Sequence, residues 1–320
     1  MPFVIATLGT QIAPEGVAIL EASGATLIAT PAYPSRTDLL ALLAQHNPDA
    51  VIIRLIEHLD GELMDAAPNL KLIAKHGVGT NDIDIAAATA RNIPVIMATG
   101  ANAHSVAEHA LGLILALTKD FAAQDRHIRA GRWDKKLYAG RELRGQKLGL
   151  VGFGLIGQIL ARMAQPLGLL VSAYDPYAPD SAFDNVTRIT DLDSLLATSD
   201  IVSLHTPLTP ATRGLIDTNR IALMQPHALF INTARGEVVD EPALIAALQA
   251  KKIAGAGLDS FAEEPPQRSP LWNLDNVILT PHVAGVTEDA KRAVSTLTAQ
   301  NVLHFLRGEA VEPRYFVKPS

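Results

Sequence analysis

The chain has 320 residues, 48% hydrophobic and 19% charged, a mixture typical of globular proteins with a sizeable core. Its 27 Lys and Arg against 33 Asp and Glu give a net charge of −6, and no basic stripe offsets it, so no nucleic acid partner is expected. The absence of cysteine excludes disulfides, thiolate nucleophiles and Cys-ligated metals, and it predicts a cytoplasmic protein.

The chain begins with a pattern typical of a buried strand instead of a signal peptide. The longest apolar helical run, 110–117, is far too short for a bilayer, which takes about 20 residues, so no membrane association is expected. The length favours two domains over one.

Short runs of apolar, often β-branched residues alternate with helical patterns over the first hundred residues. The expected strands are 4–6, 26–28, 51–53, 72–74 and 95–97, and the expected helices are 18–22, 39–45 and 82–90. This alternation predicts βαβ units, and therefore a parallel sheet with helices on both faces.

A long apolar helix is expected over 105–117, followed by a polar segment that carries Trp133 and several basic residues. This segment has no strand pattern, so it is either a surface excursion or an arm that packs on another subunit. A second α/β series follows, with strands 147–151, 170–174, 201–204, 228–232, 253–258 and 277–279, the six strands of a complete doubly wound sheet. A closing helix over 289–306 is expected to cross back onto the first domain.

A glycine-rich turn joins the first strand of this second series to the next helix. It reads Gly152-Phe153-Gly154-Leu155-Ile156-Gly157, a full G-x-G-x-x-G between a strand and a helix. The first glycine allows the tight turn, the second lets backbone N–H groups approach a pyrophosphate, and the third lets helix and strand pack closely. The helix N-terminus adds partial positive charge, so the turn predicts a dinucleotide site. A tight turn without a ligand is the alternative.

The strand after this turn ends in Asp175, where a ribose-binding acid is expected. Its carboxylate would accept hydrogen bonds from a free 2′-hydroxyl and would repel a 2′-phosphate. No Arg or Lys follows in the next four residues, so NAD is favoured over NADP. The alternative for Asp175 is a surface cap.

Three polar residues follow the last three strands directly: Arg235, Glu264 and His282. Open α/β sheets bind ligands at the carboxyl ends of their strands. Arg can hold a carboxylate bidentately, His can donate a proton to a carbonyl oxygen as hydride reaches the carbon, and a neighbouring carboxylate orients that His. The three residues therefore predict reduction of a 2-oxo acid. Taken singly, each is equally compatible with a surface ion pair, a turn or a strand cap.

The motifs together resemble those of the D-isomer-specific 2-hydroxyacid dehydrogenases, which include phosphoglycerate dehydrogenases, hydroxypyruvate and glyoxylate reductases and D-lactate dehydrogenases. The similarity rests on the glycine-rich turn, His205-Thr206-Pro207, Asn232-Thr233-Ala234-Arg235-Gly236, Leu258-Asp259-Ser260-Phe261 with Glu264-Pro265, and Pro281-His282. The resemblance implies that Arg235 binds the substrate, that His282 is the acid/base and that Glu264 is its partner. It adds His205, Thr206, Pro207, Thr233, Ala234 and Asp259 as cofactor contacts.

The resemblance also interprets the first domain. The segment Lys75-His76-Gly77-Val78-Gly79 is similar to the family's substrate loop, in which the N–H groups of Val78 and Gly79 hold the substrate carboxylate. From the residues alone it is a glycine-rich turn that could form an anion-binding nest. Arg54 ends another strand and could contact a second anionic group; a surface salt bridge is the alternative.

Two Rossmann-like domains are implied: a substrate domain of 1–99 and 285–320, and an NAD-binding domain of 100–284 inserted in it. The segment around Trp133 would exchange between the subunits of a homodimer. The expected function is hydride transfer between NAD(H) and a small 2-hydroxy or 2-oxo acid, without a metal. The cluster of Arg54, Lys75 and His76 suggests a substrate with a second anionic or polar group, such as hydroxypyruvate, glyoxylate, phosphohydroxypyruvate or sulfolactate. The alternatives are a formate- or phosphite-type dehydrogenase of the same fold and an NADH-sensing, corepressor-like interaction protein.

Overall fold

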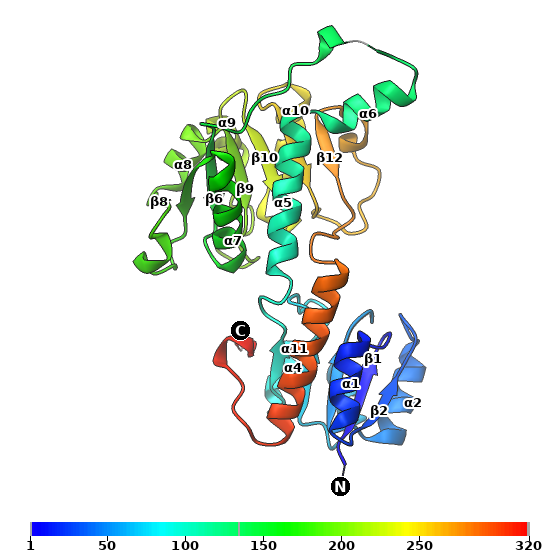
Figure 1. Ribbon diagram of the computed structural model, residues 1–320. Coiled ribbons are helices and arrows are strands. Elements are labelled where there is room, and N and C mark those ends of the chain that lie inside the picture. Colours follow the sequence, from blue (N-terminus) through cyan, green and yellow to red (C-terminus); the bar gives the residue numbers. More distant parts are fainter. Residues whose placement is uncertain (1, 134, 319–320) are drawn as a thin grey trace. The chain divides into compact units, whose positions relative to one another are not determined.

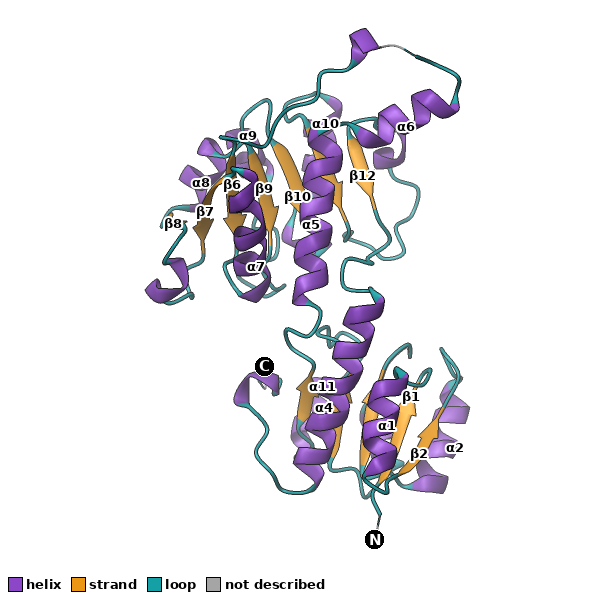
Figure 2. Cartoon of the chain, in the orientation of Figure 1, coloured by secondary structure: helices purple, strands orange, loops and turns teal. Residues whose placement is uncertain are grey.

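A computed structural model describes residues 2–133 and 135–318 of the chain. The chain forms two compact units, one of Met1–Asn102 with Val286–Ser320 and one of Ala103–Gly285. Each unit is a parallel sheet with helices on both faces (Figure 1, Figure 2), so the α/β fold with doubly wound sheets is confirmed.

The sheet of the first unit has the strand order β2-β1-β3-β4-β5. Its strands are β1 (Val4–Leu8), β2 (Thr26–Ala29), β3 (Ala50–Ile53), β4 (Leu72–Lys75) and β5 (Val95–Met97). The order reverses between β1 and β3, and this switch point is where a parallel sheet offers a crevice to ligands at the carboxyl ends of its strands.

Helices cover both faces of this sheet. On one face lie α1 (Pro14–Ala22) and α11 (Glu288–Leu306), and on the other lie α2 (Arg36–His46), α3 (Gly61–Asp65) and α4 (Ile85–Ala90). The closing helix α11 returns to the first unit, as expected. The helix expected from residue 82 begins only at Ile85, because the Asp84 carboxylate caps it by accepting a hydrogen bond of 2.8 Å from the N–H of Ala87.

The sheet of the second unit has the order β12-β11-β10-β9-β6-β7-β8, all parallel. The strands are β6 (Lys147–Val151), β7 (Leu170–Tyr174), β8 (Thr187–Arg188), β9 (Ile201–Leu204), β10 (Leu229–Asn232), β11 (Gly255–Leu258) and β12 (Val277–Leu279). This is the Rossmann order with one further strand. The sequence predicts six of the seven; β8 is missed because it pairs through two residues only, too few for a periodic pattern.

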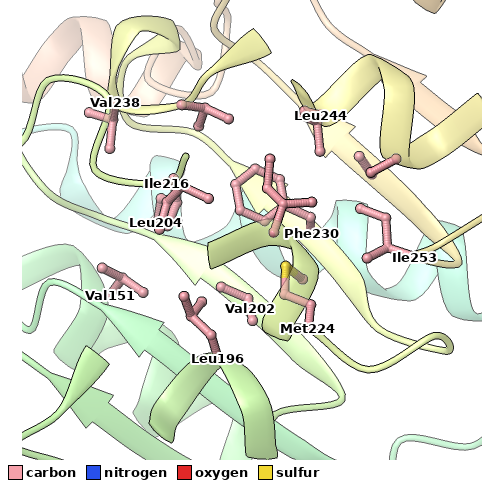
Figure 3. Packing of buried hydrophobic residues seen from close by; sticks show 14 of the residues in the cluster. Val151, Leu196, Val202, Leu204, Ile216, Met224, Phe230, Val238, Leu244 and Ile253 are labelled. Atoms are coloured by element: carbon pink, nitrogen blue, oxygen red, sulfur yellow. The ribbon is translucent and has the colours of Figure 1, made fainter. Parts of the chain in front are cut away.

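Two separate cores cover the faces of this sheet. Helices α5 (Ala103–Thr118) and α7 (Leu155–Ala164) pack on one face, and α8 (Leu192–Thr198), α9 (Thr218–Leu223) and α10 (Glu241–Gln249) pack on the other. Figure 3 shows the second core, in which Phe230 of β10 lies among Val202, Met224 and Leu244. Full burial of such a side chain contributes about 1.5–3 kcal/mol.

Between α5 and β6 the chain forms an arm of α6 (Phe121–Arg129) and a 3-10 helix (Lys135–Leu137). The sequence predicts no strand here and does not predict α6. Other 3-10 helices are Gln165–Leu167, Asp180–Phe183, Gly236–Val238, Pro270–Asn273 and Pro313–Tyr315. None of the helices in the described part of the chain combines the length and the apolar character that crossing a membrane requires.

Candidate active site

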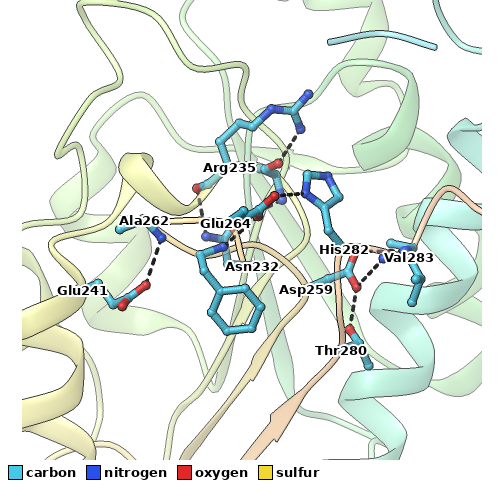
Figure 4. A network of polar contacts seen from close by, with 12 residues as sticks. Asn232, Arg235, Glu241, Asp259, Ala262, Glu264, Thr280, His282 and Val283 are labelled. Atoms are coloured by element: carbon cyan, nitrogen blue, oxygen red, sulfur yellow. Dashed lines mark hydrogen bonds and ion pairs between the residues drawn. The ribbon is translucent and has the colours of Figure 1, made fainter. Parts of the chain in front are cut away.

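The three candidate catalytic residues follow three neighbouring strands. Arg235 follows β10, Glu264 follows β11 and His282 follows β12, and these strands lie side by side. Because the strands are parallel, their carboxyl ends meet at one edge of the sheet, and Figure 4 shows the three side chains there.

A short hydrogen bond joins the histidine to the glutamate. Nδ1 of His282 lies 2.7 Å from Oε2 of Glu264, and Oε1 of Glu264 accepts a bond of 3.0 Å from the N–H of Phe261. The backbone thus fixes the Glu264 carboxylate, which accepts a hydrogen bond from the Nδ1–H group of His282. Nε2 is therefore the atom that can give or take a proton. The side chains of His282 and Glu264 are 43% and 37% exposed, so a ligand can reach them.

Asp259 fixes the backbone around His282. His282 has φ +54°, an uncommon value for a residue other than glycine. The Asp259 carboxylate, 1% exposed, accepts bonds from the N–H groups of Val283 (2.9 Å) and Ala284 (2.8 Å) and from the hydroxyl of Thr280 (2.5 Å). These bonds bracket His282 on both sides, so this carboxylate determines where the imidazole lies. The cofactor contact expected of Asp259 stays a prediction.

His109 of α5 completes this cluster and is absent from the residues predicted from the sequence. Its Nε2 lies 3.0 Å from Oγ1 of Thr280 and 3.6 Å from Oδ1 of Asp259. A histidine on the buried face of an apolar helix is the only sequence signal, and a satisfied core histidine gives the same signal.

Arg235 carries a charge that is free to bind an anion. The Asn232 side chain fixes its loop, because Nδ2 donates to the carbonyl of Arg235 (3.0 Å) and Oδ1 accepts from the N–H of Ala234 (3.0 Å). The guanidinium donates to the carbonyl of Ala234 (2.6 Å) and has no ion-pair partner among residues 2–133 and 135–318. Its remaining donors suit the bidentate binding of a carboxylate.

The glycine-rich turn has the geometry of a phosphate cradle. Gly152 has φ +92°, and a Cβ there would lie 2.7 Å from the carbonyl of His205, so glycine is required. A Cβ on Gly154 would meet no atom within 4 Å, which means that the space over the turn is open. Gly154 is the N-cap of α7, whose first N–H groups face this space without a side-chain cap. A pyrophosphate fits here.

The Asp175 carboxylate lies beside the same turn. Oδ2 accepts a hydrogen bond of 2.8 Å from the N–H of Phe153, and Oδ1 accepts bonds from the N–H groups of Tyr177 (2.8 Å) and Ala178 (3.1 Å). A carboxylate oxygen can accept two bonds, so Oδ2 retains capacity for a ribose hydroxyl.

Several polar atoms near the carboxyl ends of β9 and β10 are buried and have no partner within the described residues. They are Nδ1 of His205, Oγ1 of Thr206 and Oγ1 of Thr233. Desolvation lowers the pKa of His205 to about 4, so its imidazole is neutral at physiological pH. Buried polar atoms normally form hydrogen bonds. These three atoms could bond to the polar groups of a nicotinamide ribose and carboxamide.

The candidate substrate loop of the first unit follows β4. Gly77 has φ +140°, and the N–H groups of Val78 and Gly79 beyond it donate to no acceptor among the described residues. Two successive N–H groups without an acceptor are compatible with an anion-binding nest, which stays a prediction. Nearby, Lys75 forms an ion pair with Asp82, and burial lowers the pKa of His76 to about 4. Of the cluster of Arg54, Lys75 and His76, only Arg54 therefore supplies an unpaired charge.

These features lie at the carboxyl edge of a Rossmann sheet, and comparison with known proteins gives the family. Residues 111–284 match the model of the D-isomer specific 2-hydroxyacid dehydrogenase, NAD binding domain. The chain belongs to this family and carries its NAD-binding domain.

Relatives of several activities resemble the chain. A glyoxylate reductase of Thermofilum pendens is 43% identical over 86% of this chain and 83% of its own length. A D-3-phosphoglycerate dehydrogenase of Mycobacterium leprae is 42% identical over 87% of this chain and 52% of its own length. The crystal structure of a glyoxylate reductase from Paecilomyes thermophila superposes with a TM-score of 0.87 at 29% identity, covering 98% of this chain and 99% of that one. The chain spans about half the length of the phosphoglycerate dehydrogenases that it matches.

Proposed function

We propose that the protein is an NAD-dependent oxidoreductase that transfers a hydride between NAD(H) and a small 2-hydroxy or 2-oxo acid. The observation that carries this proposal is the 2.7 Å bond between Glu264 and His282, which leaves Nε2 of His282 free at the sheet edge where Arg235 also lies. A proton donor, its carboxylate partner and a carboxylate-binding cation are the groups that reduction of a 2-oxo acid needs.

The residues present fit a dinucleotide. The N–H groups of the turn 152–157 would hold the pyrophosphate, Asp175 the ribose, and Thr206, Pro207, Thr233 and Ala234 the nicotinamide end, with His205 behind them. When bound, the nicotinamide supplies or accepts the hydride. Asp175 favours NAD over NADP because its charge repels a 2′-phosphate.

The chain's own residues would transfer the proton and bind the substrate. In reduction, Nε2 of His282 donates a proton to the carbonyl oxygen, and the Glu264 carboxylate stabilises the charged imidazole before that transfer. Arg235 binds the substrate carboxylate and polarises the carbonyl. In oxidation, neutral His282 takes the hydroxyl proton.

The test is His282→Ala. Turnover should fall by at least about 100-fold, the usual scale for losing a general acid/base, while NADH binding measured by fluorescence is retained. His227→Ala is the matched control, because His227 is also half-exposed and bonded to a carboxylate, that of Asp200 at 2.7 Å. A near-wild-type rate in His282→Ala would refute the mechanism.

We also propose a role for each domain and a cellular location. Residues 1–99 and 285–320 would bind the substrate and residues 100–284 the cofactor. Variants of Val78 or Gly79 should then raise the KM for the oxo acid and leave NADH binding unchanged. A cytoplasmic location belongs to the same proposal, and cell fractionation tests it.

A homodimer joined through the arm is also proposed. The arm has a groove of about 480 Å³ lined by Phe121, Ile128, Trp133 and Tyr138, all of them exposed, among basic residues. An exposed apolar patch of this kind marks an interaction surface, and the arm of a second copy is its expected occupant. Phe121→Glu with Ile128→Glu should give a monomer in sedimentation equilibrium; a wild-type chain that is itself a monomer would overturn this assignment.

A further inference from the structure

His109 is a polar residue on the side of α5 that packs against the sheet of the second unit. Leu113 follows it by four residues and therefore lies on the same face of the helix. A Cβ on Gly257 of β11 would lie 3.0 Å from Cβ of Leu113, so the glycine lets α5 lie close to this strand. The His109 side chain is only 23% exposed. Such a position normally carries an apolar residue, so a polar side chain there indicates a specific partner.

The hydrogen bonds of His109 and Thr280 have only one consistent direction. Oγ1 of Thr280 lies 2.5 Å from Oδ1 of Asp259, and an ionised carboxylate can only accept, so the hydroxyl proton points to Asp259. Nε2 of His109 lies 3.0 Å from the same hydroxyl oxygen and must therefore donate to it. A chain of donated bonds thus runs from His109 through Thr280 to Asp259.

Asp259 is a buried carboxylate that forms no ion pair with a Lys or Arg in the described ranges 2–133 and 135–318. His109, with Nε2 at 3.6 Å from Oδ1, is the one basic side chain of these ranges within ion-pair distance of it. A buried carboxylate is costly unless donors surround it. The bond that His109 donates polarises the Thr280 hydroxyl, and this polarisation strengthens the bond from that hydroxyl to the carboxylate.

The other end of this chain of bonds determines the conformation of the loop that carries His282. The Asp259 carboxylate accepts bonds from the N–H groups of Val283 and Ala284, which follow His282 directly. The carbonyl of Thr280 accepts a bond of 3.0 Å from the N–H of His282 itself. Figure 4 shows Asp259 bonded to Thr280 and to Val283 beside His282. These bonds hold His282 at its φ of +54°, a conformation that needs such support.

We propose that His109 is a positioning residue for His282, the proposed acid/base, and that it acts through Thr280 and Asp259. The inference rests on the proposed function and adds a residue of α5 to it. His109 transfers no proton to the substrate: its bond keeps the Thr280 hydroxyl turned to Asp259, which holds the two amides after His282. Without His109 the hydroxyl proton can turn away from Asp259, and the loop loses part of its support.

Three substitutions separate the bond that His109 donates from the space that its ring fills. His109→Gln keeps an N–H donor near the position of Nε2, His109→Asn is too short to reach Thr280, and His109→Leu has no donor. A displacement of about 1 Å can cost 100-fold in rate, and loss of one bond should displace His282 by less than that. We therefore expect kcat to fall about tenfold in the Asn and Leu variants and to stay within about threefold of wild type in His109→Gln. The KM for the oxo acid and the Kd for NADH should change by less than about threefold.

His104→Leu is the matched control. His104 lies on the same helix and is also close to a carboxylate, that of Glu108 at 3.2 Å, but it has no contact with Thr280 or Asp259 in the described part of the chain. Its substitution should leave kcat unchanged. A wild-type kcat in His109→Leu, with His282→Ala inactive, overturns the positioning role while the proposed function stands. A Kd for NADH raised at least about tenfold with an unchanged kcat also overturns it and makes His109 part of the cofactor site.

A double substitution tests whether His109 acts through Thr280. Thr280→Val removes the hydroxyl and keeps the shape of the side chain. Residues that act through one chain of bonds are not additive, so His109→Leu combined with Thr280→Val should lose no more kcat than the more harmful single variant. Losses that multiply would mean that the two residues act independently, and they would overturn the proposal.

Amide hydrogen exchange tests the positioning without any turnover. If no 2-oxo acid is reduced, the proposed function fails and this measurement decides alone. We expect the amides of Val283 and Ala284 to exchange at least about tenfold faster in His109→Leu than in wild type, and at the wild-type rate in His109→Gln. The amides of β9 are the internal control, because a general loss of stability would speed their exchange as well. Unchanged exchange at Val283 and Ala284, or an equal rise in β9, overturns the proposal.

Discussion

Asp259→Asn tests how the candidate active site holds its histidine. The wild-type carboxylate accepts three hydrogen bonds, from the N–H groups of Val283 and Ala284 and from the hydroxyl of Thr280. An asparagine offers one accepting oxygen, and its NH2 group then faces an N–H donor. Bonds to a charged group contribute about 1.5–3 kcal/mol each, so we expect the free energy of unfolding to fall by about 2–4 kcal/mol.

Asp259→Asn should also lower the rate of catalysis, because Asp259 holds the loop that carries His282. With Val283 and Ala284 less firmly held, His282 no longer keeps its φ of +54° and its imidazole moves. A misplacement of about 1 Å can cost 100-fold in rate, so kcat should fall about 10–100-fold while the Kd for NADH changes little. Asp217→Asn is the control, because Asp217 caps α9 and asparagine caps equally well.

The assay is steady-state turnover at saturating NADH, with the Kd for NADH from fluorescence titration and the unfolding free energy from urea denaturation. An unchanged kcat with a Kd raised at least about tenfold would show that Asp259 does not position His282 and is chiefly a cofactor contact, the role that the family resemblance implies.

Three further predictions concern the cofactor, the acid/base pair and stability. Asp175→Ser should lower the ratio of kcat/KM for NADH over NADPH at least about tenfold, and an unchanged ratio would remove Asp175 from the ribose site. Glu264→Gln keeps an acceptor for Nδ1 of His282 but loses the charge, so single-turnover hydride transfer should slow about 10–100-fold; a rate within about twofold of wild type contradicts that role. The pKa of His205 is about 4 in the folded chain, below its usual 6.5, so the unfolded chain binds a proton first as the pH falls. Unfolding free energy should therefore drop by up to about 3 kcal/mol between pH 6.5 and 4, and His205→Gln should lessen that slope in urea titrations at several pH values; an equal slope would contradict the low pKa.

Local patterns in the sequence predict much of the fold. The strands of both sheets are short apolar runs such as 51–53 and 201–204, bounded by polar residues, and a buried parallel strand needs such a run. Helix starts are less predictable, because the start of α4 is decided by the cap at Asp84. The two-residue strand β8 is too short to show an alternating hydrophobic pattern, and it forms by pairing with the edge strand β7.

The candidate site is predictable where a residue's role depends on its place along a strand. Arg235, Glu264 and His282 each follow a buried strand, so the sheet alone explains why they meet. Charges that depend on tertiary contacts could not be predicted from the sequence. The sequence presents Lys75 and His76 as free cations, but Lys75 is paired with Asp82 and burial keeps His76 neutral. Lys291, more than two hundred residues after Arg54, lines the same pocket of the first unit as Arg54.

Whether the protein reduces 2-oxo acids is tested by NADH oxidation, followed by absorbance, with a panel of 2-oxo acids and repeated with NADPH. We expect turnover of at least one 2-oxo acid, a preference for NADH, and loss of turnover in His282→Ala. NADH binding confirmed by fluorescence together with no turnover across the panel would contradict this expectation, and would favour a nucleotide-sensing protein instead.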